Sequence, residues 1–126
     1  MPLTLHVLPG EYAVCRLDPQ EAPPAWAWAG PLSSVTRTLA ELSVVCAAQN
    51  VPPEVEAQRG WAALELQGPF AFTLTGILAS VLVPLQGAGI GIFALSTFDT
   101  DYVLVPESQV RKAAEALRAA GHTVVD

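Results

Sequence analysis

The chain has 126 residues, 52% of them hydrophobic, which is enough for one compact domain with its own core. Twelve acidic and six basic side chains give a formal net charge of −6, and this sign disfavours phosphate-binding surfaces, which are usually basic. We therefore expect no nucleic-acid partner and a mild preference for small or cationic partners.

Two features bear on membranes and export. The opening MPLTLHVLPG has no basic segment followed by a long apolar one, so we expect a cytoplasmic protein rather than an exported one. Residues 66–98 contain no Asp, Glu, Lys, Arg or His, but their helical pattern lasts only about fourteen residues, and a membrane-spanning helix needs about twenty. We expect a buried helix and a buried strand there, and no membrane partner.

The first half of the chain contains two strand-like runs, YAVCRL and LSVVCA, which include Cys15 and Cys46. Cysteines without CxxC spacing favour buried, reduced thiols, although a disulfide between these two remains open. Residues 19–34 between the runs are too rich in proline for a long helix. If this segment is extended, Trp26 and Trp28 face the same side and serve either as a cover for the sheet or as a lid or dimer contact.

The second half has clearer patterns. Residues 61–68, WAALELQG, predict a strand that ends at the Gly-Pro pair. In the next segment, TLTGILASVLVPLQG, Thr73 or Thr75 is the expected N-cap of a helix and Gly87 its left-handed stop. Apolar residues recur at helical spacing and predict one buried face of this helix. They are Leu74, Ile77, Leu78, Val81, Leu82 and Leu85.

Two short strands, IGIFAL and YVLV, follow and are joined by the turn STFDTD. Residues 107–121 then predict an Ala-rich helix ended by Gly121, and HTVV predicts a last strand. This β-α-β-β-α-β order is typical of an α+β, ferredoxin-like sandwich with two helices on one face of an antiparallel sheet. The first half is a weaker copy of the pattern. We therefore expect a degenerate N-terminal unit (residues 1–60) with a shortened helix and a complete C-terminal unit (residues 61–126).

Signatures of catalysis and cofactor binding are weak. The glycine-rich GAGIG at residues 87–91 ends a helix and opens a strand, whereas a dinucleotide loop follows a strand and opens a helix. No GxSxG is present, and His6 and His122 have no partner at metal-ligand spacing. We therefore expect no enzyme activity and no cofactor. A metal-dependent enzyme that uses Asp99 and Asp101 is the less favoured alternative.

One arrangement of residues suits a small ligand. The expected helix start at Thr75, Gly76 and Ile77 presents backbone N–H groups without intrahelical partners, and these can bind a carboxylate. In a βαββαβ unit the turn with Phe98 and Asp99 lies at the same end of the sheet, so Asp99 can meet an ammonium group. A free amino acid carries both groups. The simpler interpretation is that Asp99 only ends a strand.

Five segments in order, LPGEYAVCRLD, SVTRTLAELSVVC, RGWAALELQGP, LTGILAS and LSTFDTDYVLV, resemble the small bacterial tandem ACT-domain proteins. These are relatives of the ACT units that regulate aspartokinases and of the eukaryotic cytosolic arginine sensors. The resemblance implies two ferredoxin-like units, with effector sites at interfaces between units. It also implies a carboxylate-binding helix start and a strand-end segment that contacts the backbone and basic side chain of the ligand. The residues at these positions are Thr75, Gly76, Ile77, Thr97, Phe98 and Asp99.

Together these patterns predict a non-catalytic regulatory module that binds a free amino acid, with a basic one as an option, between the helix start near Gly76 and the turn at Phe98 and Asp99. The arginine sensors have two tandem pairs and this chain has one. We therefore expect the site at a unit or subunit interface and the protein as a homodimer. The alternative is an interaction or oligomerisation module that binds no ligand.

Overall fold

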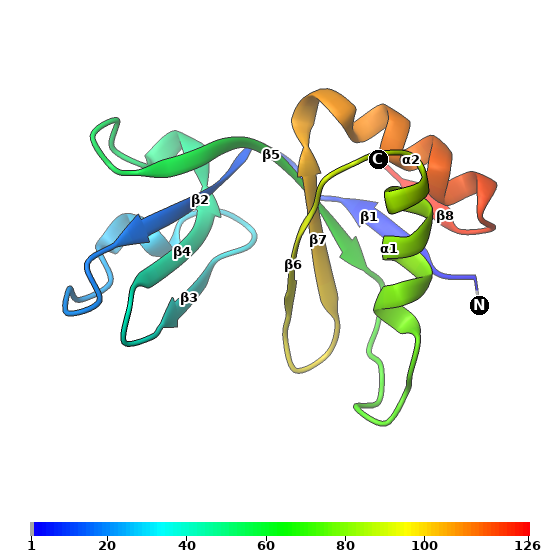
Figure 1. Cartoon of the computed structure of the whole chain (residues 1–126), viewed down its shortest axis with the longest axis horizontal. Helices are drawn as coiled ribbons and strands as arrows, with labels where there is room; N and C mark the ends of the chain where they lie inside the picture. Colours follow the sequence, from blue (N-terminus) through cyan, green and yellow to red (C-terminus); the bar gives the residue numbers. More distant parts are fainter. Residues whose placement is uncertain (1) are drawn as a thin grey trace. The chain divides into compact units, whose positions relative to one another are not determined.

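The computed structural model describes residues 2–126 and divides them into two compact units (Figure 1). One unit combines the start of the described chain, as far as Leu8, with Ala62–Asp126, and the other comprises Pro9–Trp61. This division differs from the expected one at residue 60 because the first residues belong with the C-terminal half. They form strand β1 (Thr4–Val7), which pairs with two strands of that half.

The C-terminal unit is a sheet with two helices on one face, which confirms the predicted α+β, ferredoxin-like class (Figure 1). Strand β1 lies between β5 and β8, antiparallel to β5 and parallel to β8. Strand β7 pairs with both β5 and β6. The elements are β5 (Ala57–Leu66), α1 (Ile77–Gly87), β6 (Phe93–Ser96), β7 (Asp101–Pro106), the 3-10 turn η3 (Glu107–Gln109), α2 (Val110–Ala119) and β8 (Thr123–Val125).

The core of this unit lies between the sheet and the helices. Alternate residues of the strands point toward the helices, because successive side chains of a strand face opposite sides. On α1 every predicted core position packs against this core except Leu74, which precedes the helix and is exposed. Fully buried members of the core include Leu5, Leu64, Leu66, Val81, Leu85, Val103, Val105 and Leu117.

The uncharged passage forms a loop, one helix and one strand. Helix α1 is only 11 residues long, and it is followed by β6 after a short glycine-rich connection. The helix buries one face, as predicted, but the strand is not fully buried, because Phe93, Ala94 and Leu95 are half-buried and Ser96 is exposed. Within residues 2–126, no helix combines the length and the apolar character that crossing a membrane requires.

The end of α1 differs from the prediction. Gly87 is still helical, and the glycine with a left-handed backbone is Gly89, at φ 74°. The Gly89 N–H donates to the Gln86 carbonyl at 3.0 Å, and the Ile90 N–H donates to the Leu85 carbonyl at 3.0 Å. These bonds satisfy carbonyls that the end of the helix leaves free, so the left-handed residue comes two positions later than expected.

A buried histidine joins three parts of the C-terminal unit. The Leu3 N–H donates to Nδ1 of His122 at 3.0 Å, and Nε2 lies 2.9 Å from the Ser80 carbonyl oxygen. Because Nδ1 accepts a hydrogen bond, the ring is neutral and its Nε2–H donates to Ser80. His122 therefore has a structural role, in which it connects the start of the chain, α1 and the segment before β8.

The N-terminal unit is a smaller antiparallel sheet. Its strands β2 (Tyr12–Leu17), β3 (Ser34–Arg37) and β4 (Leu42–Ala47) are ordered β3-β4-β2, and the first part of β5 lies next to β2. One 3-10 turn, η1 (Ala25–Trp28), stands where the first helix of the pattern would be. A second, η2 (Ala48–Asn50), follows β4. The expected shortened helix is therefore a single turn.

The tryptophans and cysteines of this unit have distinct environments. Because η1 is a 3-10 turn and not an extended segment, Trp26 packs on the core of the unit whereas Trp28 is 57% exposed. Cys15 and Cys46 are buried free thiols on the neighbouring strands β2 and β4. A hydrogen bond between the two thiols lowers the pKa of Cys15 and raises the pKa of Cys46. Buried, reduced thiols are what the spacing predicted.

Candidate functional site

Two loops meet at one end of the C-terminal unit (Figure 1). The loop that leads from β5 to α1 lies against the turn that connects β6 to β7. The Phe70 N–H donates to the Asp99 carbonyl at 2.8 Å, and the Thr100 hydroxyl donates to the Leu66 carbonyl at 2.5 Å. One main-chain bond and one side-chain bond therefore tie the helix-start loop to the hairpin turn, as the predicted topology requires.

The hairpin turn is held by Thr97 and Thr100. The Thr97 N–H donates to the Thr100 carbonyl at 2.8 Å, and the Thr100 N–H donates to the Thr97 hydroxyl at 3.3 Å. Phe98 and Asp99 form the exposed tip between them. The two threonines thus fix the backbone that presents the aromatic ring and the carboxylate.

Gly68 permits the close contact between the two loops. A Cβ at this position would lie 2.9 Å from the Asp99 carbonyl oxygen and 3.2 Å from the Thr100 Cβ. Gly68→Ala is therefore expected to displace the turn and to destabilise the C-terminal unit by about 1–3 kcal/mol, as at other overpacked sites. Urea unfolding measures the loss, with Gly91→Ala as the control, because a Cβ there meets nothing within 4 Å. Equal losses in both variants would contradict this account.

The start of α1 differs in detail from the prediction. Neither Thr73 nor Thr75 caps the helix: the N-cap is Gly76, at φ 77°, and no side chain bonds to it. A side-chain cap requires an extended backbone at the N-cap, whereas this residue is left-handed, a conformation that glycine adopts readily. The first helical residue is Ile77, so the N–H groups without intrahelical partners begin there rather than at Thr75.

A pocket of about 170 Å³ lies between the loop and the turn. Of the predicted site residues, the structure brings Ile77, Thr97, Phe98 and Asp99 together around it. The remaining two, Thr75 and Gly76, are exposed and do not line the pocket. The other lining residues are Phe70, Ala71, Phe72, Leu74, Ser96, Thr100 and Asp101. Pockets for drug-sized ligands typically have volumes of about 300–1,000 Å³, so this pocket suits a smaller molecule.

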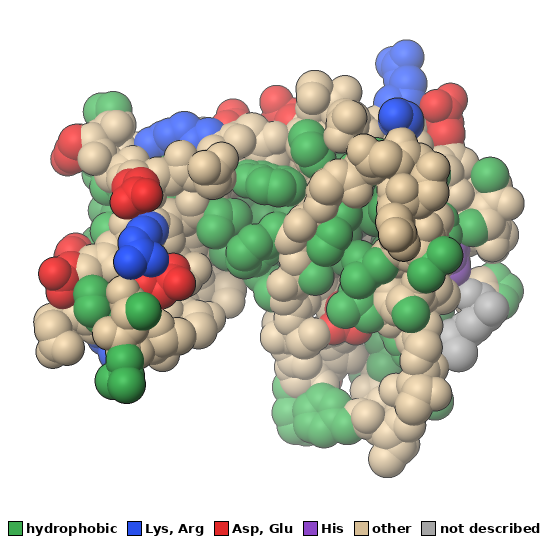
Figure 2. Space-filling view, in the orientation of Figure 1, with side chains coloured by type: hydrophobic (Ala, Val, Ile, Leu, Met, Phe, Trp, Pro, Cys, Tyr) green, Lys and Arg blue, Asp and Glu red, His purple; other side chains and the backbone are tan. Residues whose placement is uncertain are grey.

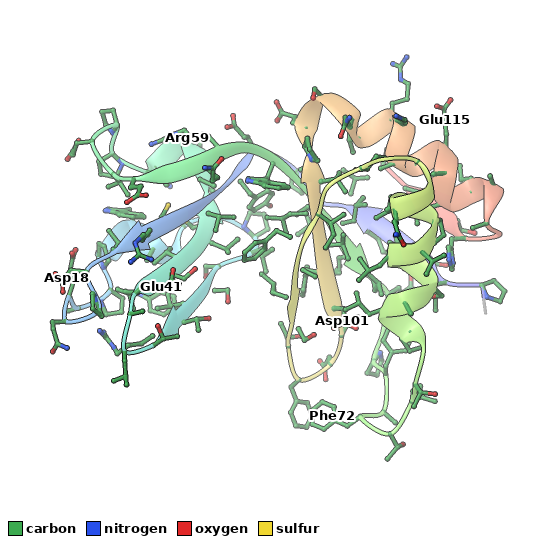
Figure 3. All side chains as sticks on the ribbon, viewed as in Figure 1. Asp18, Glu41, Arg59, Phe72, Asp101 and Glu115 are labelled. Carbon is green, nitrogen blue, oxygen red and sulfur yellow. The ribbon has the colours of Figure 1, made fainter. Side chains whose placement is uncertain are left out.

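Two aromatic rings stand beside this pocket. The centroids of Phe72 and Phe98 are 5.1 Å apart with an interplanar angle of 66°, an edge-to-face contact. Figure 3 shows Phe72 at the tip of the unit. The two side chains are 76% and 81% exposed, so the pair presents apolar surface to a ligand or partner. The space-filling view shows hydrophobic side chains gathered at this tip (Figure 2). Phe72 was not among the predicted site residues.

A polar hollow of about 350 Å³ adjoins the same turn and shares Thr97, Asp99 and Thr100 with the pocket. Here the Tyr102 hydroxyl donates to Oε2 of Glu65 at 2.8 Å, while Nε2 of His6 lies 2.7 Å from Oε1 of Gln67. Burial, the hydrogen bond to Glu65 and the nearby carboxylates of Glu65 and Asp99 raise the pKa of Tyr102 to about 12. The pair of Tyr102 and Glu65 was not predicted, although the alternation in WAALELQG places Glu65 on the face of the strand away from the core.

Tyr102 is expected to lose its proton only near pH 12. Since its folded-state pKa lies above the ordinary value of 10.0, the folded protein holds this proton more tightly than the unfolded chain. The resulting stabilisation is complete below pH 10 and is lost as the pH rises through about 12. The ultraviolet absorbance of tyrosinate, compared between the wild type and Tyr102→Phe, measures this step. Glu65→Gln should lower the pKa, and a wild-type step at the ordinary value would contradict the assignment.

Asp101 has an internal partner, because its Oδ1 accepts a hydrogen bond from the Ser96 hydroxyl. Asp99 and Asp101 both line the pocket of about 170 Å³, and none of its other lining residues is a His, Cys, Asp or Glu. Across residues 2–126, the structure contains no group of three or more His, Cys, Asp or Glu side chains that could hold a metal ion.

Solved structures share the fold of the whole chain. A protein from Agrobacterium tumefaciens, known from its X-ray crystal structure, is 46% identical, with 99% of this chain and 93% of that chain covered and a TM-score of 0.93. A protein of unknown function from Vibrio cholerae is 18% identical over 94% and 89% of the two chains, with a TM-score of 0.76. The ligand-free regulatory subunit of aspartate kinase from Thermus thermophilus is 14% identical over 90% and 94%, with a TM-score of 0.62.

Family models cover both halves of the sequence. One described as an N-terminal domain matches residues 10–54, and the model of the ACT domain matches residues 56–119. No curated protein matches the sequence significantly. The ACT-domain match spans more than half of the 126 residues and includes the loop, the turn and both helices of the C-terminal unit. The chain therefore belongs to the ACT-domain family.

Proposed function

We propose that this ACT-domain chain is a regulatory module without catalytic activity that binds a free amino acid at the pocket between the start of α1 and the β6–β7 turn. The observation that carries the proposal is that a helix start and a carboxylate, which favour opposite charges on a ligand, both border the pocket of about 170 Å³. Ile77 begins a helix whose first N–H groups lack intrahelical partners, and Asp99 lies on the facing turn.

The two ends of an amino acid would bind by different forces. The N–H groups in the first turn of α1 point out of the N-terminal end of the helix. This end carries partial positive charge, so it suits the ligand carboxylate. The carboxylate of Asp99 suits the ammonium group, through a charge-assisted hydrogen bond. The exposed rings of Phe72 and Phe98 stand next to the space and can cover the side chain of the ligand. An acid beside the pocket is compatible with basic amino acids as well as with neutral ones.

A thermal-shift panel of the twenty amino acids tests the proposal. A ligand at one hundred times its dissociation constant stabilises the folded protein by about 2.7 kcal/mol, which is readily measured. Asp99→Asn is expected to weaken the binding of the best ligand by about 10- to 100-fold, because a hydrogen bond to a charged group is worth about 1.5–3 kcal/mol. Asp18→Asn, an exposed acid in the N-terminal unit, is the matched control. Absence of any shift across the panel would refute amino-acid binding.

Regulation requires that the ligand favour one state of the protein over another. A ligand can shift an equilibrium only by the difference in its affinity for the two states. We propose a homodimer as the assembly through which this occurs, with the pocket near the subunit interface and the whole in the cytoplasm. Strand β6, which contributes the first half of the hairpin, would then connect the pocket to the partner.

Two features of the C-terminal unit support a homodimer. Among the described residues β6 pairs only with β7, so its second edge offers free N–H and C=O groups to another strand. Helix α1 has no charged residue, and an apolar groove of about 570 Å³ runs along it beside residues 89–92. Hydrophobic side chains are visible on this helix in Figure 2. A two-fold axis would place both features against their own copies.

Val83 provides the test of this dimer, because it lies on α1 and is 64% exposed. Val83→Glu is expected to shift the protein from dimer to monomer in sedimentation equilibrium, since the charge would be buried against its own copy. Leu39→Glu is the control, because Leu39 is 99% exposed in the other unit. If wild type and both variants have the same mass, this interface is wrong.

A further inference from the structure

A second pocket, of about 710 Å³, lies wholly within the N-terminal unit. It shares no residue with the pocket between the start of α1 and the β6–β7 turn, called the α1 pocket below. It is built from other elements: the turn before β2, the turn after η1, the end of β4 with η2, and the first part of β5. Its polar side chains are Glu11, Gln49 and Arg59. The backbone turns at Gly10 and Gly30, both with left-handed φ, also line it.

Arg59 is held in this pocket by main-chain oxygens and not by an acid. Its guanidinium donates to the carbonyls of Ala48 at 3.4 Å, Val51 at 3.4 Å and Pro52 at 3.0 Å. Within residues 2–126 the one ion pair closer than 4.0 Å joins two other residues of the unit. A guanidinium has five N–H donors, so the fixed group keeps both its charge and donor capacity for an anion.

Glu11 supplies the opposite charge. Its Oε2 accepts a hydrogen bond from the Gly60 N–H at 2.8 Å, which fixes the carboxylate next to the residue that follows Arg59. A carboxylate has about four acceptor positions, so Oε1 and part of Oε2 are available to a further donor. The pocket therefore contains one fixed cation and one fixed anion, each oriented by backbone groups.

Two glycines that line this pocket have different surroundings. A Cβ on Gly30 would come within 2.7 Å of the Ala47 Cβ, so the turn after η1 approaches β4 only because no side chain intervenes. At Gly10 a Cβ would meet nothing within 4 Å, which leaves that part of the wall without a side chain. The rim thus consists of backbone and small residues around two charged groups.

We propose that this pocket is a second ligand site, for a small zwitterion whose carboxylate meets Arg59 and whose ammonium group meets Glu11. The guanidinium donors that are not used by the three carbonyls can form a charge-assisted hydrogen bond with a carboxylate, and a carboxylate binds an ammonium group in the same way. The site differs from the α1 pocket in the unit that carries it and in its use of a guanidinium in place of helix amides. Binding here is independent of whether the α1 pocket holds a ligand.

A series of ω-amino acids tests the proposal, because their charges are separated by chains of increasing length. Glycine, β-alanine, 4-aminobutanoate and 5-aminopentanoate are titrated into the 15N-labelled full chain, with acetate and methylammonium as single-charge probes. We expect one length to bind at least tenfold more tightly than either single-charge probe. The amides that shift should be those of residues 10–11, 30, 47–49 and 59–60. Shifts confined to residues 77–79 and 97–100 would assign all binding to the α1 pocket and overturn the second site.

Charge-removing variants complete the test. Arg59→Gln and Glu11→Gln are each expected to weaken the best probe at least tenfold, whereas Arg16→Gln, another arginine of the same unit paired with Glu41, should leave it unchanged. Glu11→Gln keeps an acceptor for the Gly60 N–H, and far-ultraviolet circular dichroism checks that each variant is folded. Arg59→Lys retains the charge without the guanidinium geometry, so intermediate affinity is expected. Tight binding of acetate alone, unaffected by Glu11→Gln, would refute the zwitterion site.

Discussion

Replacing Leu64 with alanine is expected to destabilise the C-terminal unit by about 2–5 kcal/mol, the range found for large-to-small changes in well-packed cores. Leu64 lies in β5 opposite Val7 of β1 and is fully buried in the core between the sheet and the helices. Removal of its isobutyl group leaves a cavity between the sheet and the helices, which the surrounding side chains fill only in part. Such a loss is a large part of the 5–15 kcal/mol that stabilises a typical domain.

The measurement is urea unfolding followed by the circular dichroism of the helices, both of which belong to the C-terminal unit. Leu39→Ala is the control, because Leu39 is 99% exposed and the same chemical change there should alter the midpoint little. Similar midpoints for Leu64→Ala and Leu39→Ala would show that β5 does not carry the core as described. The comparison also reports on β1, since Leu64 faces it.

Most of the C-terminal fold could be predicted from periodicity. The spacing of apolar residues in α1 is a local property, and the helix forms where the pattern predicts it because burial of that face dominates. Its boundaries were less accurate: the stop falls at Gly89 and not at Gly87, and the N-cap is Gly76. Both differences depend on which glycine is left-handed, and φ cannot be read from the residue type alone.

Strand β1 was not predicted. It has only four residues, which is too short for an alternating pattern to stand out. Its partners, such as Leu66 in β5 and Val124 in β8, lie in the distant half of the chain. Pairing of this kind depends on the assembled sheet, so local sequence carries little information about it.

The candidate site was predicted in part. Topology places the start of α1 and the β6–β7 turn at the same end of the sheet, and the structure has Ile77, Thr97, Phe98 and Asp99 around one pocket. Thr75 and Gly76 lie outside it, and the amides without intrahelical partners begin at Ile77, one residue after the left-handed N-cap. The contact between Tyr102 and Glu65 was missed since it joins two strands whose register is set by the core.

Gly30→Ala is expected to destabilise the N-terminal unit by about 2–5 kcal/mol, because two separate costs add. An alanine at the left-handed φ of 95° costs roughly 1–2 kcal/mol. Its Cβ would also lie 2.7 Å from the Ala47 Cβ and 3.3 Å from the Ala47 backbone nitrogen, which costs roughly 1–3 kcal/mol where the backbone must move. The Ala47 N–H also donates to the Ala29 carbonyl, in the turn after η1, at 3.1 Å. A displaced turn would lose this hydrogen bond as well.

Gly10→Ala separates the two costs. Gly10 has a similar left-handed φ of 89°, but its Cβ would meet nothing within 4 Å, so only the backbone cost applies. Urea unfolding of both variants, followed by tryptophan fluorescence, should give the larger loss for Gly30→Ala, and the difference measures the contact with β4. Both glycines line the Arg59 pocket, so the same pair of variants relates its shape to binding. If a zwitterion binds Gly10→Ala normally and Gly30→Ala weakly, binding depends on the close approach of the turn after η1 to β4. Equal unfolding losses in the two variants would contradict that close approach.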